Sequence, residues 1–223
     1  MLALVPLDTA LGCAAALNRL FHDTMAQVLS YDIKPLTLSV GLAIVHCYED
    51  LRTLLAWGRA AEATAKRTRD TLAVALHTRS AGASAVTAAH AWARDPMARW
   101  RRWIDWYRYD VLPDGAAFEL RALARELRDL AQAGHDVSPI VDAECRRILR
   151  RKKGRRGTRE LAEAEIDLML QPDRLETAQG VQSPTLLDKL EETVNEMIIA
   201  RHIERAERLA GGVAADQMEA AHG

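Results

Sequence analysis

The sequence has few cysteines and almost no net charge, and each shortage excludes a class of protein. Its three cysteines, Cys13, Cys47 and Cys145, show no CxxC spacing. That pattern indicates reduced thiols and excludes a disulfide scaffold and a zinc-ligand signature. A formal net charge of −1 excludes a globally basic nucleic-acid coat protein but allows a local basic patch.

The sequence also lacks an apolar run long enough to span a membrane. Its N-terminal apolar segment has no positively charged start and is interrupted by Asp8, Asn18 and Arg19, unlike a signal peptide. We therefore expect a cytoplasmic protein that makes no membrane contact.

The first part of the chain alternates between strand-like and helical patterns. Residues 2–6, 36–46 and 71–77 are apolar runs that predict strands. Helical spacing predicts helices over about 8–29 and 49–69. The resulting order is β-α-β-α-β, which is typical of an α/β sandwich. Because 36–46 is almost continuously apolar, it is expected to be a central strand covered on both faces.

This predicted sheet is too small to be complete. It opens at residue 2 and has only three strands, which would leave a flat apolar strand beside an unpaired edge. We therefore expect a pairing partner from another chain or from sequence upstream.

The second part of the chain has only helical periodicity. Residues 79–88 are small and typical of a linker, and Gly211-Gly212 is expected to end the last helix. Ser138-Pro139 and Ser183-Pro184 each place a capping serine before a proline suited to the first helical position. The predicted helices are about 89–110, 116–133, 138–153, 158–170 and 183–209.

Three stretches resemble, in order, the second palm domain of the large subunit of type III (Cmr-type) CRISPR effector complexes. They are LALVPLDTALGCAAALNRLF, LTLSVGLAIVH and AAEATAKRTRDTLAVALHTRS. The matching positions are Ser39, Gly41 and His46 in a Ser-x-Gly strand, Ala65 and Lys66 at a helix end, and His77, Arg79 and Ser80 in the next strand.

The resemblance implies an α+β fold, with a partial ferredoxin-like, GGDEF-like palm followed by an all-helical domain. The implied boundaries are a palm half over 1–80, a linker over 81–88, helices over 89–210 and a flexible tail over 211–223. It also implies partners: the other subunits of a CRISPR ribonucleoprotein, and the guide and target RNA.

The same family carries a Gly-Gly-Asp-Asp hairpin directly before a strand like residues 2–6. Its carboxylates hold the two Mg or Mn ions used in cyclic oligoadenylate synthesis. The 223 residues contain no Gly-Gly-Asp-Asp. We therefore expect the chain to bind ATP without catalysing alone, to supply no catalytic or metal-ligating residue, and to require the upstream half of the same palm.

The nucleotide contacts implied by the resemblance are Ser39, Gly41, Lys66 and Arg67. Ser39 would face the phosphates beside the flat Gly41, and Lys66, with Arg67 as a substitute, would neutralise a triphosphate. Each has a structural alternative: a serine bonded to neighbouring backbone, and cations that favour the end of a helix dipole. His46 and His77 end predicted strands without other ligands at suitable spacing, which indicates packing or hydrogen bonding.

A basic run places nine cations within fourteen residues. Such density repels itself and favours contact with an RNA backbone. The alternative is a solvated helix end and loop, neutralised by Glu160, Glu163, Glu165 and Asp167. The proposed RNA contacts are Arg146, Arg147, Arg150, Arg151, Lys152, Lys153, Arg155 and Arg156, and Arg159 is the last cation of the run.

The aromatic residues concentrate on one predicted helix. Trp100, Trp103 and Tyr107 share a face at i, i+3, i+7 and are expected to be core. Trp106 and Tyr109 are predicted to point elsewhere, where they could dock a partner or stack on a base.

The leading functional interpretation is the C-terminal portion of the CRISPR large subunit in RNA-guided antiviral defence. It would join a nucleotide-binding palm to subunit and RNA contacts. Two alternatives remain open: the complementing half of a split cyclic oligoadenylate synthase, and a helical RNA-binding adaptor.

Overall fold

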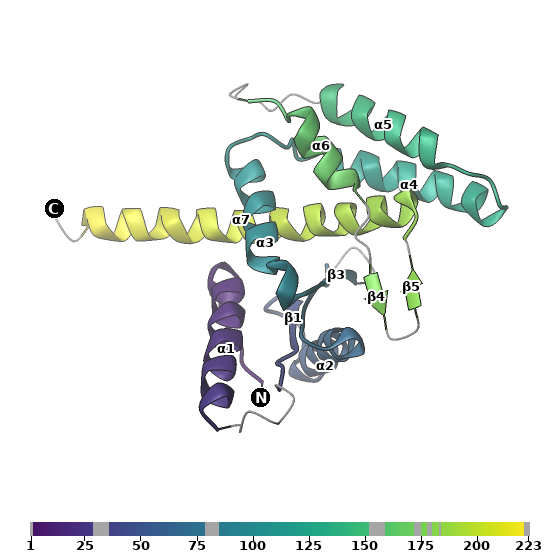
Figure 1. Cartoon of the computed structure of the whole chain (residues 1–223). Helices are drawn as coiled ribbons and strands as arrows, with labels where there is room; N and C mark the ends of the chain where they lie inside the picture. The colour runs from purple at the N-terminus through teal and green to yellow at the C-terminus, as the bar shows by residue number, and fades with distance from the viewer. Residues whose placement is uncertain are drawn as a thin grey trace. The chain divides into compact units, whose positions relative to one another are not determined.

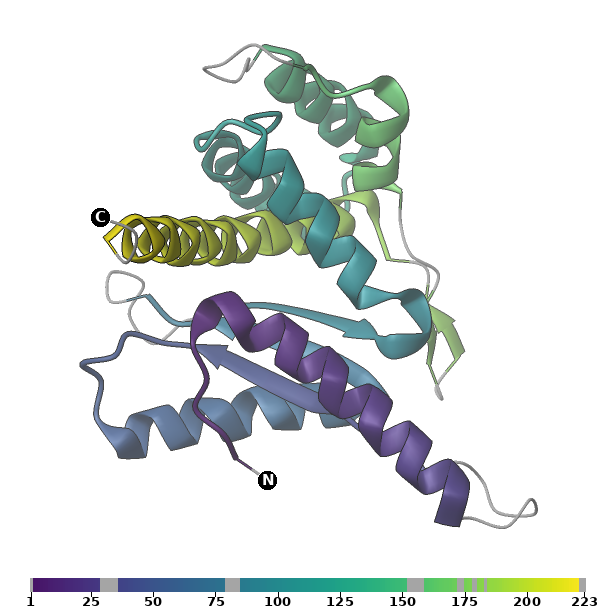
Figure 2. The same cartoon turned by 90° about the vertical axis from the view of Figure 1, so that its left-hand side faces the viewer.

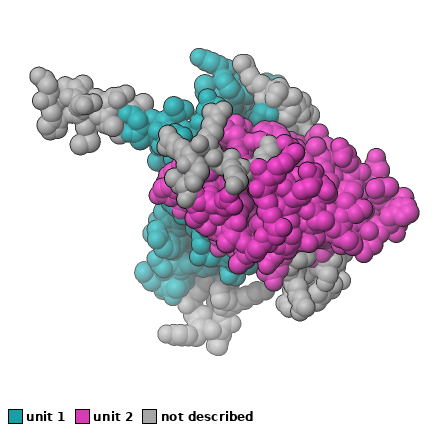
Figure 3. All heavy atoms as spheres, turned by 90° about the horizontal axis from the view of Figure 1, so that it is seen from above, with its two compact units in different colours: residues 1–101, 202–223 teal, residues 102–201 magenta. Residues whose placement is uncertain are grey.

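The computed structural model describes residues 2–28, 36–78, 85–151, 159–171, 175–177, 180–182 and 184–220 (Figure 1). The chain divides into two compact units, coloured separately in Figure 3. Unit 1 comprises residues 1–101 and 202–223, and unit 2 comprises residues 102–201. Among the described residues, no helix is both long and apolar enough to cross a membrane.

Unit 1 contains a three-stranded mixed sheet with the strand order β1-β2-β3. Strand β1 is parallel to β2, and β3 is antiparallel to β2. The elements in chain order are α1 (Leu7–Val28), β1 (Val40–Ile44), α2 (Leu51–Thr68), β2 (Thr71–Leu76) and β3 (Val86–Ala91), followed by the 3-10 helix η2 (Trp92–Arg94) and the first residues of α3 (Pro96–Arg108).

The two faces of this sheet differ in side-chain size. Paired residues in the register share a face, so Gly41 and Ala43 of β1 lie with Ala73 and Ala75 of β2 and with Ala89 of β3. These small residues lie on the side of α2, which runs along the sheet in Figure 2 and approaches Gly41 closely. The opposite face carries larger side chains, namely Val40, Leu42, Ile44, Leu72, Val74, Leu76 and Val86.

The expected α+β class and three of the palm elements are confirmed. Helices α1 and α2 and strand β2 form where the patterns predicted them. Helix α2 begins after Asp50, whose carboxylate accepts a 2.9 Å hydrogen bond from the Thr53 backbone N–H.

Two strand predictions in the palm were wrong. Residues 2–6 form no strand in the described part of the chain, because no described segment pairs with them. Strand β1 is shorter than 36–46 and, among the described strands, lies at an edge and is half-buried. The central strand is β2, all six of whose residues are buried. An apolar run therefore indicated a strand but not its position in the sheet.

The third strand comes from a segment that was predicted to be linker and helix. Residues 86–91 pair with β2, and α3 starts only at Pro96 rather than near residue 89. This segment is alanine-rich, and alanine is the strongest helix former, so propensity favoured a helix. Pairing with a fully buried neighbouring strand overrides that preference. The rest of the expected 81–88 linker lies mostly outside the described residues.

Unit 2 consists of helices around a buried apolar core, with one short hairpin. It contains the end of α3, helices α4 (Ala116–Gln132), α5 (Ser138–Arg151) and α6 (Glu163–Leu170), the hairpin strands β4 (Leu175–Thr177) and β5 (Gly180–Gln182), and the start of α7 (Leu186–Ala220). The hairpin was not predicted. The buried side chains of unit 2 include Trp103, Ile104, Leu120, Val141, Cys145, Ile166, Leu190, Val194 and Met197.

Helix α7 begins and ends differently from its prediction. Its first turn is capped reciprocally: Thr185 Oγ1 accepts from the Asp188 N–H at 3.1 Å, and Asp188 accepts from the Thr185 N–H at 3.0 Å. Ser183 lies outside the described residues. The helix continues through Gly211-Gly212 to Ala220, although a helix-interior glycine costs about 1 kcal/mol relative to alanine.

Candidate functional site

Gly41 lies directly against the backbone of α2. A Cβ atom built on Gly41 would lie 2.2 Å from the Glu62 nitrogen and 2.4 Å from the Ala61 carbonyl carbon. Ala61 is itself buried at this crossing. Only a residue without a side chain lets the helix approach the strand so closely. The structure therefore gives Gly41 a packing role on the α2 side of the sheet.

Lys66 lies on the last turn of α2 with its ammonium group in solvent. Its side chain is 64% exposed, and its Nζ lies 2.6 Å from Glu62 Oε1. The hydrogen bond from Lys66, followed by its positive charge, lowers the pKa of Glu62. Arg67 is also exposed on this turn. Both cations lie where they complement the helix dipole, as the structural alternative requires.

Glu62 connects two of the predicted contacts. Its backbone touches Gly41, and its carboxylate holds the Lys66 ammonium. Ser39 is half-buried just before β1, and no described side-chain hydrogen bond joins it to the other predicted contacts. Sequence reasoning did not include Glu62, although its i, i+4 spacing from Lys66 was a usable signal.

His46 and His77 make the packing and hydrogen-bonding contacts that their positions predicted. The His46 Nδ1 accepts a 3.2 Å hydrogen bond from the Tyr48 backbone N–H. The His77 ring stacks on Trp57 of α2, with centroids 4.1 Å apart and planes at 13°. Burial lowers the pKa of His77. These histidines fix local structure at the ends of β1 and β2.

The described arginines of the basic run in unit 2 all lie in ion pairs with carboxylates. Arg146 is held by Asp142, Glu163 and Asp167, and hydrogen bonds to Asp142 and then Asp167 raise its pKa. The other pairs are Arg147–Glu144, Arg150–Glu163, Arg151–Glu119 and Arg159–Glu165, at 2.5 to 2.8 Å.

These pairs bear on both interpretations of the basic run. Glu163, Glu165 and Asp167 belong to the acidic helix that was expected to neutralise the run, so part of the charge is compensated within unit 2. The other four predicted RNA contacts, Lys152, Lys153, Arg155 and Arg156, lie outside the described residues.

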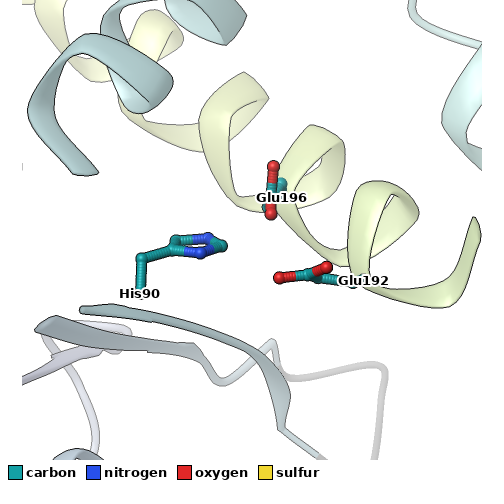
Figure 4. Close-up of side chains that lie close together, drawn as sticks. All are labelled: His90, Glu192 and Glu196. Atoms are coloured by element: carbon teal, nitrogen blue, oxygen red, sulfur yellow. The ribbon is translucent and has the colours of Figure 1, made fainter. Parts of the chain in front are cut away.

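Helix α7 carries charged side chains that are buried and paired within unit 2. Glu192 and Glu196 lie one turn apart on this helix (Figure 4). Lys189 is only 1% exposed and donates to Glu192 at 3.0 Å. The indole N–H of Trp103 donates to Glu196 at 2.6 Å. Since a buried carboxylate is costly without such donors, these bonds orient α3 and α7 within this unit.

The aromatic predictions were right for the core and wrong for one tryptophan. Trp100, Trp103 and Tyr107 are buried, as expected. Trp106 is also buried, at 5% exposure, whereas Tyr109 is exposed. Trp106 packs edge-to-face against Trp103, with ring centroids 5.0 Å apart, which explains its burial.

Comparison with known proteins gave one match. Residues 1–73 match the family model described as "Cas10/Cmr2, second palm domain". No curated protein and no solved structure matches. The matched region contains α1, β1 and α2 and the start of β2, in the order that the palm predicts. The N-terminal third of this chain therefore matches the second palm domain of a Cas10/Cmr2-type large subunit of type III CRISPR systems.

Proposed function

We propose that the chain works within a type III effector complex, where its palm segment contributes ATP contacts and its helical region docks RNA and other subunits. The observation that carries this proposal is the palm match over residues 1–73, which contains all four proposed nucleotide contacts. The order α1, β1, α2, β2 in unit 1 supports it independently of the motif residues.

Lys66 is the residue best placed for a phosphate contact. Its partner Glu62 is itself about half exposed, with 48% of its side chain accessible. Exposed pairs of this kind contribute only about 0–1 kcal/mol, so a polyphosphate can displace Glu62. Gly41 would contribute its backbone groups to the nucleotide contact and would not leave room for a phosphate, because α2 fills the space beside it. Arg67 lies on the same helical turn and would supply a second charge.

The basic run would contact RNA by exchanging its carboxylate partners for phosphates. Arg147, Arg150 and Arg151 have exposed side chains, and each is paired at the surface of unit 2. Their geometry is therefore already that of guanidinium groups holding oxyanions. The contact should depend strongly on salt, because each phosphate that is bound releases counterions.

The nucleotide proposal is tested by reconstitution. The chain is mixed with a separately supplied upstream palm segment that carries Gly-Gly-Asp-Asp, and cyclic oligoadenylate is measured with ATP and Mg or Mn. We expect no product from the chain alone and a metal-dependent product from the mixture. Product from the chain alone would contradict the proposal, and product from the mixture would also support the split-synthase alternative.

The role of Lys66 is tested in the same assay and by ATP binding to the mixture. Lys66→Ala should weaken ATP binding, whereas Arg52→Ala should not. Arg52 is a matched control because it is an exposed cation on the first turn of the same helix. Equal ATP affinities for the two variants would leave Lys66 with only its role at the helix end.

A further inference from the structure

Unit 2 has an open pocket beside the C-terminal end of α3 that combines aromatic rings with guanidinium groups. Its volume is about 480 Å³, within the usual range for small-ligand sites. The lining residues are Arg102, Asp105, Trp106, Tyr109, Val111 and Arg159. None of them belongs to the nucleotide contacts of the palm, and only Arg159 belongs to the basic run.

The aromatic part of the wall joins a fixed ring to an exposed one. Trp106 packs edge-to-face against Trp103. Trp106 also forms a hydrogen bond with Glu165, and this bond helps to lower the pKa of the Glu165 carboxyl, on which Arg159 has the larger effect. Tyr109 lies one turn of chain further on and is 64% exposed. An exposed ring beside a rigid one offers a face for a flat ligand without rearrangement of the core.

The charges of the wall add up to about one positive charge. Arg159 is neutralised by Glu165, with Arg159 nitrogens 2.8 and 2.5 Å from the two carboxylate oxygens. Asp105 lies 3.8 Å from Arg108 in a loose, partly exposed pair. Arg102 is exposed and has no ion-pair partner among the described residues. It therefore supplies the uncompensated positive charge of the pocket.

We propose that this pocket holds one nucleotide of single-stranded RNA, with its base against Tyr109 and its phosphodiester at Arg102. A phosphodiester carries one negative charge, which matches the wall, whereas the several charges of a free nucleoside triphosphate do not. The base must be unstacked to lie on Tyr109, which requires a single strand. The Asp105 carboxylate can accept from a ribose 2′-hydroxyl, the group that distinguishes RNA from DNA.

This inference rests on the proposed RNA contact of the helical region and adds a specific base-binding site to it. Arg159 links the two in sequence, because it ends the run that begins at Arg146. The run would follow the backbone without regard to sequence, and the pocket would fix one base at a defined place along it.

The test measures binding of the full chain to a short fluorescent single-stranded RNA, and compares Tyr109→Ala with Tyr109→Phe. The phenylalanine variant keeps the ring and is the matched control. Loss of one base stack weakens binding roughly five- to 140-fold, so we expect that loss for the alanine variant and nearly unchanged binding for the phenylalanine variant. Because Tyr109 is exposed, both variants should keep the thermal unfolding curve of the wild type.

Competition identifies the source of the nucleotide. Unlabelled RNA should displace the probe much better than AMP or ATP, and better than DNA of the same sequence. Asp105→Ala, which removes the hydrogen-bond acceptor, should remove the preference for RNA over DNA. If wild-type chain binds no RNA, the proposed RNA contact fails together with the pocket. If it binds but Tyr109→Ala and Tyr109→Phe bind equally, or AMP competes as well as RNA, the pocket proposal alone is overturned.

Discussion

Gly41 of β1 and Glu62 of α2 are in direct backbone contact, and this contact sets the distance between helix and sheet in unit 1. A Cβ atom on residue 41 would lie 2.2 Å from the Glu62 nitrogen, so that no side chain fits there unless the helix or the strand moves. Glu62 in turn holds Lys66, so the packing of β1 also positions the proposed phosphate contact.

Gly41→Ala should therefore destabilise the chain, by roughly 1–3 kcal/mol, because the added methyl group must push α2 off the sheet. The matched control is Gly12→Ala on α1, where nothing lies within 4 Å of the added Cβ. That change should be neutral or stabilising by up to about 1 kcal/mol, since alanine is the better helix former. Urea unfolding of both variants checks the prediction, and equal midpoints would contradict it.

Leu4→Lys should reduce concentration-dependent association of the chain. Leu4 is 74% exposed in an apolar segment, and that segment has no pairing partner among the described residues. Exposed apolar segments of this kind promote association, and lysine opposes it. Leu209→Lys is the control, because Leu209 on α7 is 63% exposed outside that segment. Light scattering against concentration should fall for Leu4→Lys and change little for Leu209→Lys.

The stacked His77 should make unit 1 less stable as the pH falls. Burial lowers its folded-state pKa below the ordinary value of 6.5, so the unfolded chain binds the proton more readily. The stability that depends on a neutral His77 is fully present above about pH 6.5, and it is lost as the pH falls from there towards the folded-state pKa. His77→Phe keeps a ring against Trp57 and should flatten this slope. Thermal unfolding between pH 7.5 and 5 measures it, and parallel curves for the two chains would count against the prediction.

The sequence could predict elements whose signal is local, but not which residues pair across the chain. Lys66 and Arg67 marked the end of α2 correctly, because dipole effects act within one turn. Strand β3 was missed because three of its six residues are alanine, a strong helix former, and only the buried β2 beside it makes them a strand. The same limit applies to sites: Gly41 was identified, but its contact with Glu62 joins residues on two different elements.

The arginines of the basic run that the structure describes are already paired with carboxylates. If Arg150 binds phosphate, its carboxylate partner Glu163 competes with RNA for the same guanidinium group. Glu163→Gln removes that competition for Arg150 and Arg146, so it should raise RNA affinity. If the run is only a solvated helix end, Glu163→Gln should alter the stability slightly and leave the affinity for RNA unchanged.

Removing cations of the run, instead of their acidic partner, should lower the affinity for RNA by a measurable amount. Replacing Arg150, Arg151, Lys152 and Lys153 by Gln should weaken binding about equally for unrelated RNA sequences, because backbone contacts do not read bases. Each phosphate contact that is lost should remove about 0.7 from the slope of log affinity against log salt on single strands. The fold should be unaffected, since the Arg150–Glu163 and Arg151–Glu119 pairs are exposed and such pairs contribute about 0–1 kcal/mol.

An unchanged slope together with an unchanged affinity for Glu163→Gln would show that these arginines serve only to join α5 to its neighbouring helices. A raised affinity for Glu163→Gln and a reduced slope for the quadruple change would require the guanidinium groups to exchange carboxylates for phosphates.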